Sequence, residues 1–209
     1  MKTDDLIHIL SSATPPRPPM SLVAALVLLA VFSFALVFFW EGVRPDLLAG
    51  DISAGLLFKT GFLSAVFVVS LFRLRRCAGP RAYKAPVLDG LYMMLWVGLA
   101  AFVLLRAVTV PHDVLASMYS AESAVCLPYV TFYGVVGLAV LLRLMQHYAP
   151  ADPQRAAGMS AAAAAAAGAL GYMLHCPMDD PAHLLVAYGL PVLLLSFLGG
   201  RYAARFLRW

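Results

Sequence analysis

A nine-residue segment, His175 to His183, concentrates side chains that bind metals or react with oxidants in this chain of 209 residues. It reads His-Cys-Pro-Met-Asp-Asp-Pro-Ala-His. Thiolate, imidazole and carboxylate groups together suit zinc or a softer ion such as cadmium. Cys126 and His112, in earlier parts of the chain, offer the same chemistry. The candidate metal ligands are therefore His112, Cys126, His175, Cys176, Asp179, Asp180 and His183.

The cysteines Cys126 and Cys176 allow more than one chemistry, and three interpretations stay open. In an oxidising envelope they could form a disulfide, either structural or redox-reversible. They could instead belong to a metal site, although the spacing matches no established zinc signature. The segment could also be a polar turn shaped by Pro177 and Pro181, with no ligand at all. Any pairing requires that both cysteines lie on the same side of a membrane.

The composition indicates a membrane protein. Apolar residues make up 62% of the chain and charged residues 12%, whereas about 25% is usual in soluble domains. A soluble fold of this size would need more polar surface to cover its core, so a soluble enzyme or a free DNA-binding domain is excluded. The net charge of +4 is therefore no sign of nucleic-acid binding, and the position of the charges matters more.

Six apolar stretches are long enough to cross a bilayer, since a spanning helix needs roughly 20 residues. The fifth is the weakest, because its core is seven consecutive alanines, which favour a helix but are only mildly apolar. We expect an all-α integral membrane protein: a six-transmembrane-helix bundle with a cytoplasmic segment over 1–20 and a basic cytoplasmic tail over 201–209. The expected spans are about 21–40, 52–72, 87–105, 122–142, 158–174 and 184–200.

The basic residues predict the orientation, because Lys and Arg accumulate on the cytoplasmic side. Twelve of them fall in residues 1–20, 73–86, 143–157 and 201–209, against only Arg44 and Arg106 on the other side. Both termini are therefore expected in the cytoplasm. This topology places Cys126 and Cys176 on the outer face, whereas Cys77 lies on the cytoplasmic side.

One basic residue, Lys59, lies well inside a predicted span. Intramembrane charges are functional candidates by default, but Lys59 is close enough to the outer end to snorkel or to pair with Glu41, Asp51 or Glu122. We therefore expect a structural role. Asp89, near the inner end of the third span, is expected to pair with the basic loop.

The N-terminal segment has the pattern of a short docking helix. Thr3 can cap it, Asp4 and Asp5 suit its positive dipole end, and three apolar residues share one face. Such a short helix needs a partner groove to hold it; the alternative is a helix that rests on lipid. The predicted docking residues are Lys2, Thr3, Asp4, Asp5, Leu6, Ile7 and Leu10.

Several motifs in order along the chain resemble the NrsF family, bacterial six-helix inner-membrane anti-sigma factors. They are MKTDDLI at the start, VRPDL after the first span, LLFKTGF around Lys59, CLP at Cys126, LHCPMDDP around Cys176, and the final RW. The resemblance implies that the cytoplasmic N-terminus holds an extracytoplasmic-function sigma factor of the sigma F type inactive. It also implies that Cys126 and Cys176 sense oxidants or heavy metals.

We therefore expect a non-enzymatic sensor in the bacterial inner membrane. Its expected partners are the sigma factor and the lipid bilayer, with no direct contact to nucleic acid and no small-molecule substrate. Its only expected cofactor is zinc or another soft metal ion at the cysteine site. The alternatives are a membrane thiol/disulfide oxidoreductase, which usually needs a CxxC pair that this chain lacks, and a small transporter.

Overall fold

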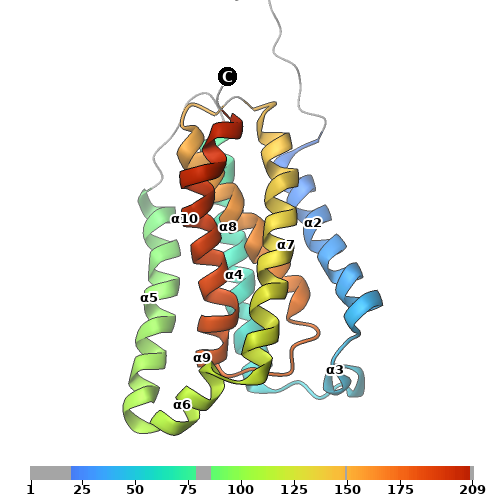
Figure 1. Ribbon diagram of the computed structural model, residues 1–209, viewed down its shortest axis with the longest axis vertical. Coiled ribbons are helices and arrows are strands. Elements are labelled where there is room, and N and C mark those ends of the chain that lie inside the picture. Colours follow the sequence, from blue (N-terminus) through green and yellow to red (C-terminus); the bar gives the residue numbers. More distant parts are fainter. Residues whose placement is uncertain (1–19, 79–85, 149, 208–209) are drawn as a thin grey trace, which may run out of the picture.

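The computed structural model describes residues 20–78, 86–148 and 150–207, and in these parts the chain is helical with no strand. The long helices run side by side along the long axis (Figure 1). Five of them are long and apolar enough to cross a membrane, which indicates a membrane protein. The elements are α2 (Leu22–Leu36), η1 (Val37–Glu41), α3 (Pro45–Ala49), α4 (Ala54–Cys77), α5 (Pro86–Thr109), α6 (Pro111–Met118), α7 (Ala121–Met145), α8 (Pro153–Tyr172), α9 (Pro181–His183), η2 (Leu184–Gly189), α10 (Leu190–Tyr202) and η3 (Ala203–Leu207).

The alanine-rich helix α8 is the centre of the bundle. Every residue from Ala156 to Tyr172 is buried, and α8 contacts α2, α4, α7 and α10. Small residues allow this close packing: a Cβ added at Gly168 would lie 2.6 Å from the Cβ of Tyr133. Its 20 residues correspond to about 30 Å of helix. It is not among the five strongly apolar helices, so its insertion as a sixth span stays a prediction.

Side-chain caps fix where the helices begin. The hydroxyls of Ser21, Ser53 and Ser120 accept hydrogen bonds from backbone N–H groups in the first turns of α2, α4 and α7. The carboxylates of Asp152 and Asp180 do the same for α8 and α9. These caps satisfy donors that the helix itself leaves unpaired.

Helices α4, α5 and α7 extend beyond the predicted spans at their C-terminal ends. Helix α4 ends at Cys77 and α5 at Thr109, where the apolar stretches suggested about 72 and 105. Arginines occupy these last turns, and cations are favourable there because the helix dipole is negative at its C-terminus. Charged residues that end an apolar stretch in the sequence therefore still belong to the helix.

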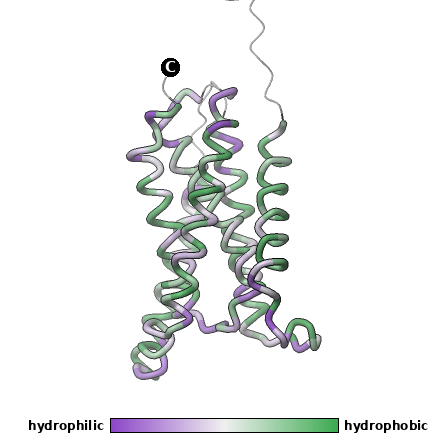
Figure 2. The backbone as a smooth tube through the Cα atoms, turned by 45° about the vertical axis from the view of Figure 1, so that its right-hand side comes forward, coloured by the Kyte–Doolittle hydropathy of each residue, from purple (hydrophilic) through white to green (hydrophobic). Residues whose placement is uncertain are grey.

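The two ends of the bundle differ in charge. Residues 20 and 207 lie at the same end, where the Tyr148 hydroxyl donates to the Met20 carbonyl (3.2 Å). Hydrophilic stretches gather at both ends (Figure 2). Described arginines at the end with residues 20 and 207, called here the basic end, are Arg73, Arg75, Arg76, Arg143, Arg155, Arg201 and Arg205. The opposite end, called here the thiol end, has Arg44 and Arg106.

Candidate functional site

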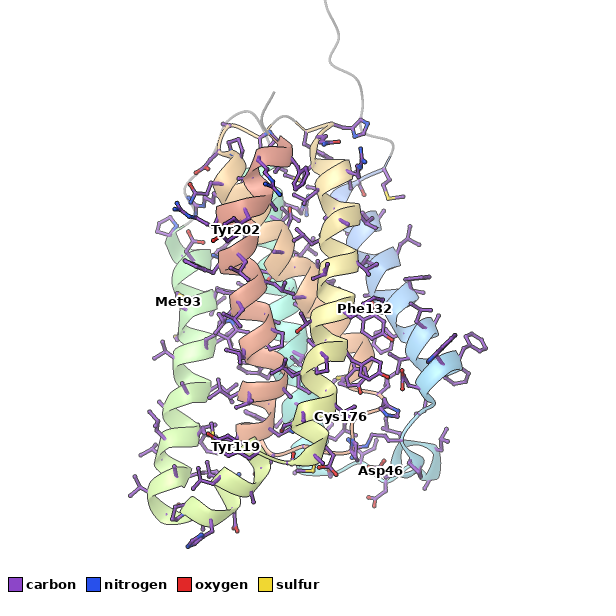
Figure 3. The ribbon with its side chains drawn as sticks, viewed as in Figure 1. Asp46, Met93, Tyr119, Phe132, Cys176 and Tyr202 are labelled. Atoms are coloured by element: carbon purple, nitrogen blue, oxygen red, sulfur yellow. The ribbon has the colours of Figure 1, made fainter. Side chains whose placement is uncertain are left out.

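The hairpin that joins α8 to α9 brings two cysteines and a histidine together at the thiol end. Cys176 lies in this hairpin (Figure 3), Cys126 on α7 and His183 at the end of α9. One ligand atom from each lies within 4.8 Å of the others, and all three side chains are buried. Zn–S bonds of about 2.3 Å in a tetrahedral site place two sulfurs about 3.8 Å apart. A shift of about 1 Å is therefore enough for one ion to contact all three groups.

The hydrogen bonds of Ser123 define the orientation of the His183 ring. Ser123 Oγ lies 2.7 Å from His183 Nδ1 and donates to the Ser117 carbonyl at 2.9 Å. A hydroxyl has one proton to donate, so Ser123 Oγ accepts the Nδ1–H of His183. The lone pair of Nε2 then faces Cys176 Sγ, 3.2 Å away. In this tautomer Nε2 is the ring nitrogen available to bind a metal ion or to accept the proton of the Cys176 thiol.

A widened helical turn follows His183. The π-helical segment η2 (Leu184–Gly189) precedes Pro191, which lacks an N–H and therefore cannot donate the usual bond to the carbonyl four residues before it. The widened turn places the Tyr188 ring 6.0 Å from the His183 ring, with Lys59 Nζ 4.9 Å from the centre of the Tyr188 ring.

Two buried cations attach the hairpin to the neighbouring elements. Arg44 donates to both carboxylate oxygens of Asp179 (2.8 and 2.9 Å) and to the Cys176 carbonyl (3.1 Å). Lys59, on α4, donates to the carbonyls of Cys176 (3.2 Å) and Met178 (2.8 Å), and its Nζ lies 3.5 Å from Asp179. We call Arg44, Lys59 and Asp179 the hairpin clamp. It holds the backbone from Cys176 to Asp179.

The predicted partners of Lys59 are wrong. Its carboxylate partner is Asp179, not Glu41, Asp51 or Glu122, and its side chain is fully buried rather than directed toward water. The reason is that the hairpin folds over the first turn of α4, where Gly55 has no side chain. A Cβ at Gly55 would lie 2.9 Å from the Cβ of Asp179. Asp89 does pair with Arg73 (2.8 Å), as expected, and also with Arg155.

The charges around the hairpin favour ionised groups. A hydrogen bond from Cys126 lowers the pKa of the Cys176 thiol below its usual range; the bond to His183 and the charge of Lys59 act in the same direction, and burial opposes them. The pKa of Arg44 is raised by its hydrogen bonds to Asp46 and Asp179. The pKa of Asp46 is lowered by its bond to Arg44. Cys176 is therefore the thiol most ready to react as thiolate.

A cavity of about 230 Å³ reaches the two cysteines. Its walls include Glu122, His175 and Tyr172 beside Cys126 and Cys176. All three cysteines of the chain are free in the structure. The cavity gives an ion or a small oxidant space next to both thiols.

The remaining candidate ligands have other partners or lie elsewhere. Asp179 belongs to the hairpin clamp, and Asp180 pairs with Arg106 and caps α9. His175 Nδ1 lies 3.1 Å from the Gly42 carbonyl. His112 is exposed on α6. The geometry thus groups only Cys126, Cys176 and His183 among the candidates that the structure describes.

Sequence reasoning missed Ser123 and Arg44. A serine three residues before a cysteine on one helix gives a weak signal, because only the fold brings the His183 ring to it. Arg44 offered a stronger signal, since it is one of two arginines on a side with few cations, within the VRPDL motif. The predicted docking residues over 2–10 lie outside the described residues.

The comparisons with known proteins identify a family. A family model described as NrsF, negative regulator of sigma F, matches residues 8–209, nearly the whole chain. The searches of curated proteins and of solved structures returned no match.

Proposed function

The chain belongs to the NrsF family, the negative regulators of sigma F, and from this premise we propose that it is a non-enzymatic, membrane-bound anti-sigma factor with a thiol sensor. In this proposal the cytoplasmic segment 1–20 sequesters an extracytoplasmic-function sigma factor of the sigma F type. Both termini face the cytoplasm of a bacterial inner membrane, and α8 crosses the membrane together with the five strongly apolar helices, which gives six spans. The basic end supports this orientation, because seven described arginines lie there against two at the thiol end.

The observation that carries the proposal is the buried group of Cys126, Cys176 and His183 beside a cavity at the thiol end. In the proposed orientation this end faces the oxidising compartment. An oxidant such as a peroxide would accept two electrons from the two sulfurs, the proton of the Cys126 thiol and one proton from solvent, which leaves a Cys126–Cys176 disulfide and reduces the peroxide to water. A thiophilic metal ion would instead bind Sγ of each cysteine as thiolate and Nε2 of His183, and would displace the proton of the Cys126 thiol.

Either event would pull Cys176 toward α7, and the hairpin would move with it. The hairpin is continuous with α8 and bound to α4 through Lys59. Helix α8 in turn contacts α2, which follows the docking segment. The proposed signal path therefore runs from the hairpin through α8 to the first helix. For a decisive switch, the stimulus must favour one arrangement of the bundle by several kcal/mol.

The experiment that tests the docking part is affinity capture from bacterial membranes solubilised in mild detergent. The full-length chain is compared with a version that lacks residues 1–19, and captured proteins are identified by mass spectrometry. A sigma factor captured only by the full-length chain supports the proposal. Equal capture by both versions would move the binding surface to the helical bundle, and no sigma factor from cells that express one would refute the anti-sigma assignment.

A further inference from the structure

A second cavity, of about 340 Å³, lies at the basic end, far from the thiol group. Its lining residues come from α4, α5, α8 and α10, from the parts of these helices near the basic end. Three guanidinium groups line it, from Arg73, Arg155 and Arg201, with one carboxylate, from Asp89. The lining therefore has two more positive than negative charges.

The hydrogen bonds around this cavity leave donors available. Asp89 accepts from Arg73 Nε at 2.8 Å and also from Arg155. The Arg73 guanidinium lies 4.1 Å from the centre of the Tyr92 ring, and this contact helps to position the guanidinium. Arg73 Nη1 is nevertheless buried without a hydrogen-bond partner among the described residues. Arg201 is exposed and forms no ion pair within the same residues. Buried N–H donors rarely stay unpaired, so the cavity is suited to an anion.

One wall of the cavity is apolar and faces outward from the bundle. Phe197 lies one helical turn before Arg201 on α10 and is 70% exposed. Because α10 belongs to a helix apolar enough to cross a membrane, an exposed phenylalanine one turn inside its last arginines faces acyl chains. A ligand with both an anionic head and apolar tails matches both parts of the cavity, whereas an acidic peptide would match only the guanidinium groups.

We propose that this cavity binds the phosphate head group of an anionic phospholipid, with an acyl chain against Phe197. Phosphate oxygens accept charge-assisted hydrogen bonds from guanidinium groups, and basic pockets between spanning helices are suited to such head groups. The bound phosphate accepts from Arg73 Nη1 and from Arg201, and so bridges α4 and α10. This inference is independent of the sigma factor and of the thiol group.

The test is lipid binding to the full-length protein in detergent, measured by native mass spectrometry. Phosphatidylglycerol is titrated against phosphatidylcholine, which has the same phosphate but no net charge. We expect the protein to retain phosphatidylglycerol in preference to phosphatidylcholine. The variant Arg201→Gln breaks no ion pair of the described residues, so it leaves the fold intact. We expect it to bind phosphatidylglycerol about fivefold more weakly, as loss of one basic contact predicts.

The matched control is Arg205→Gln, one turn further along at the same end and outside the cavity. It should bind as the unaltered protein does. The variant Asp89→Asn should bind phosphatidylglycerol more tightly, because the carboxylate no longer competes with the phosphate for Arg73 and Arg155. Equal retention of the two lipids, or equal loss in Arg201→Gln and Arg205→Gln, would overturn the site.

Two further arms separate the lipid from other anions. Inorganic phosphate alone is tested for thermal stabilisation of the delipidated protein, and a polyglutamate peptide is tested as a competitor. Stabilisation by phosphatidylglycerol but by neither of these supports the lipid assignment. Equal stabilisation by inorganic phosphate would mean a free-anion site, and equal competition by polyglutamate would mean a site for an acidic polypeptide. Either result would overturn the lipid assignment.

Discussion

Substitution of Asp179 by Asn should destabilise the protein strongly, because it removes the carboxylate of the hairpin clamp. Lys59 is fully buried, and Asp179 is its carboxylate partner. Removal of one partner from a buried ion pair costs about 3–5 kcal/mol, because the other charge stays in a dry site. Arg44 retains Asp46, and Lys59 retains two carbonyl acceptors. We therefore expect a loss near the lower limit, about 3 kcal/mol.

The free energy of unfolding can be measured by titration of the detergent-solubilised protein with sodium dodecyl sulfate, followed by circular dichroism. The matched control is Asp46→Asn, which removes the other carboxylate that pairs with Arg44. The Asp46 side chain is 34% exposed. Exposed pairs contribute little, so this control should lose less than about 1 kcal/mol.

A double variant separates the charge effect from a packing effect. In Lys59→Met with Asp179→Asn, no buried ammonium is left without a carboxylate, so the double variant should lose less than the sum of the single losses. The reasoning would be refuted if Asp179→Asn stayed within about 0.5 kcal/mol of the unaltered protein, or if the two losses were additive.

Three further predictions concern the thiol group and the packing of α8. Ser123→Ala removes the acceptor that orients His183, so cadmium affinity measured by titration calorimetry should fall about 10–100-fold; unchanged affinity would mean that the ring needs no such partner. Because its pKa is lowered, Cys176 should be alkylated at nearly the same rate at pH 8 and pH 5, whereas the alkylation of an ordinary thiol with a pKa of about 8.5 slows steeply between these pH values. The alkylation rate is measured by mass spectrometry of the chain. A steep decline at Cys176 would contradict the lowered pKa. Gly171→Ala would place a Cβ 2.6 Å from a side chain of α2 and should lower the free energy of unfolding by about 1–3 kcal/mol. Its control is Gly98→Ala, whose Cβ meets nothing within 4 Å and which should be neutral or stabilising by up to about 1 kcal/mol. Equal unfolding curves for the two variants would refute the close packing.

The long helices and their order could be predicted from the sequence because stretches of roughly 20 apolar residues are strong signals. Their ends could not, since arginines such as Arg75 and Arg76 end the apolar stretch but continue α4. The central position of α8 was also not predicted. Seven alanines indicate a helix, but only packing shows that four other helices surround it.

The candidate site was predicted in part. The alternation of spans placed Cys126 and Cys176 on one face, and the structure groups them. Which of the other five candidate ligands joins them depends on the hairpin path and on the widened turn after His183, and neither is visible as a periodic pattern. The predicted carboxylate partners of Lys59 were wrong for a related reason. The absence of a side chain at Gly55 lets the hairpin approach α4, and a contact between residues so distant in sequence has no local signal.

The central claim is that the thiols of Cys126 and Cys176 control release of a sigma factor. The most direct measurement is the amount of sigma factor held by the full-length protein in membrane vesicles before and after addition of cadmium or hydrogen peroxide. The same measurement on Cys126→Ser, Cys176→Ser and, as the matched control, Cys77→Ser isolates the sensing pair. We predict release from the unaltered protein and from Cys77→Ser, and retention by the other two variants in the presence of either stimulus. Equal release from all four proteins would contradict the claim.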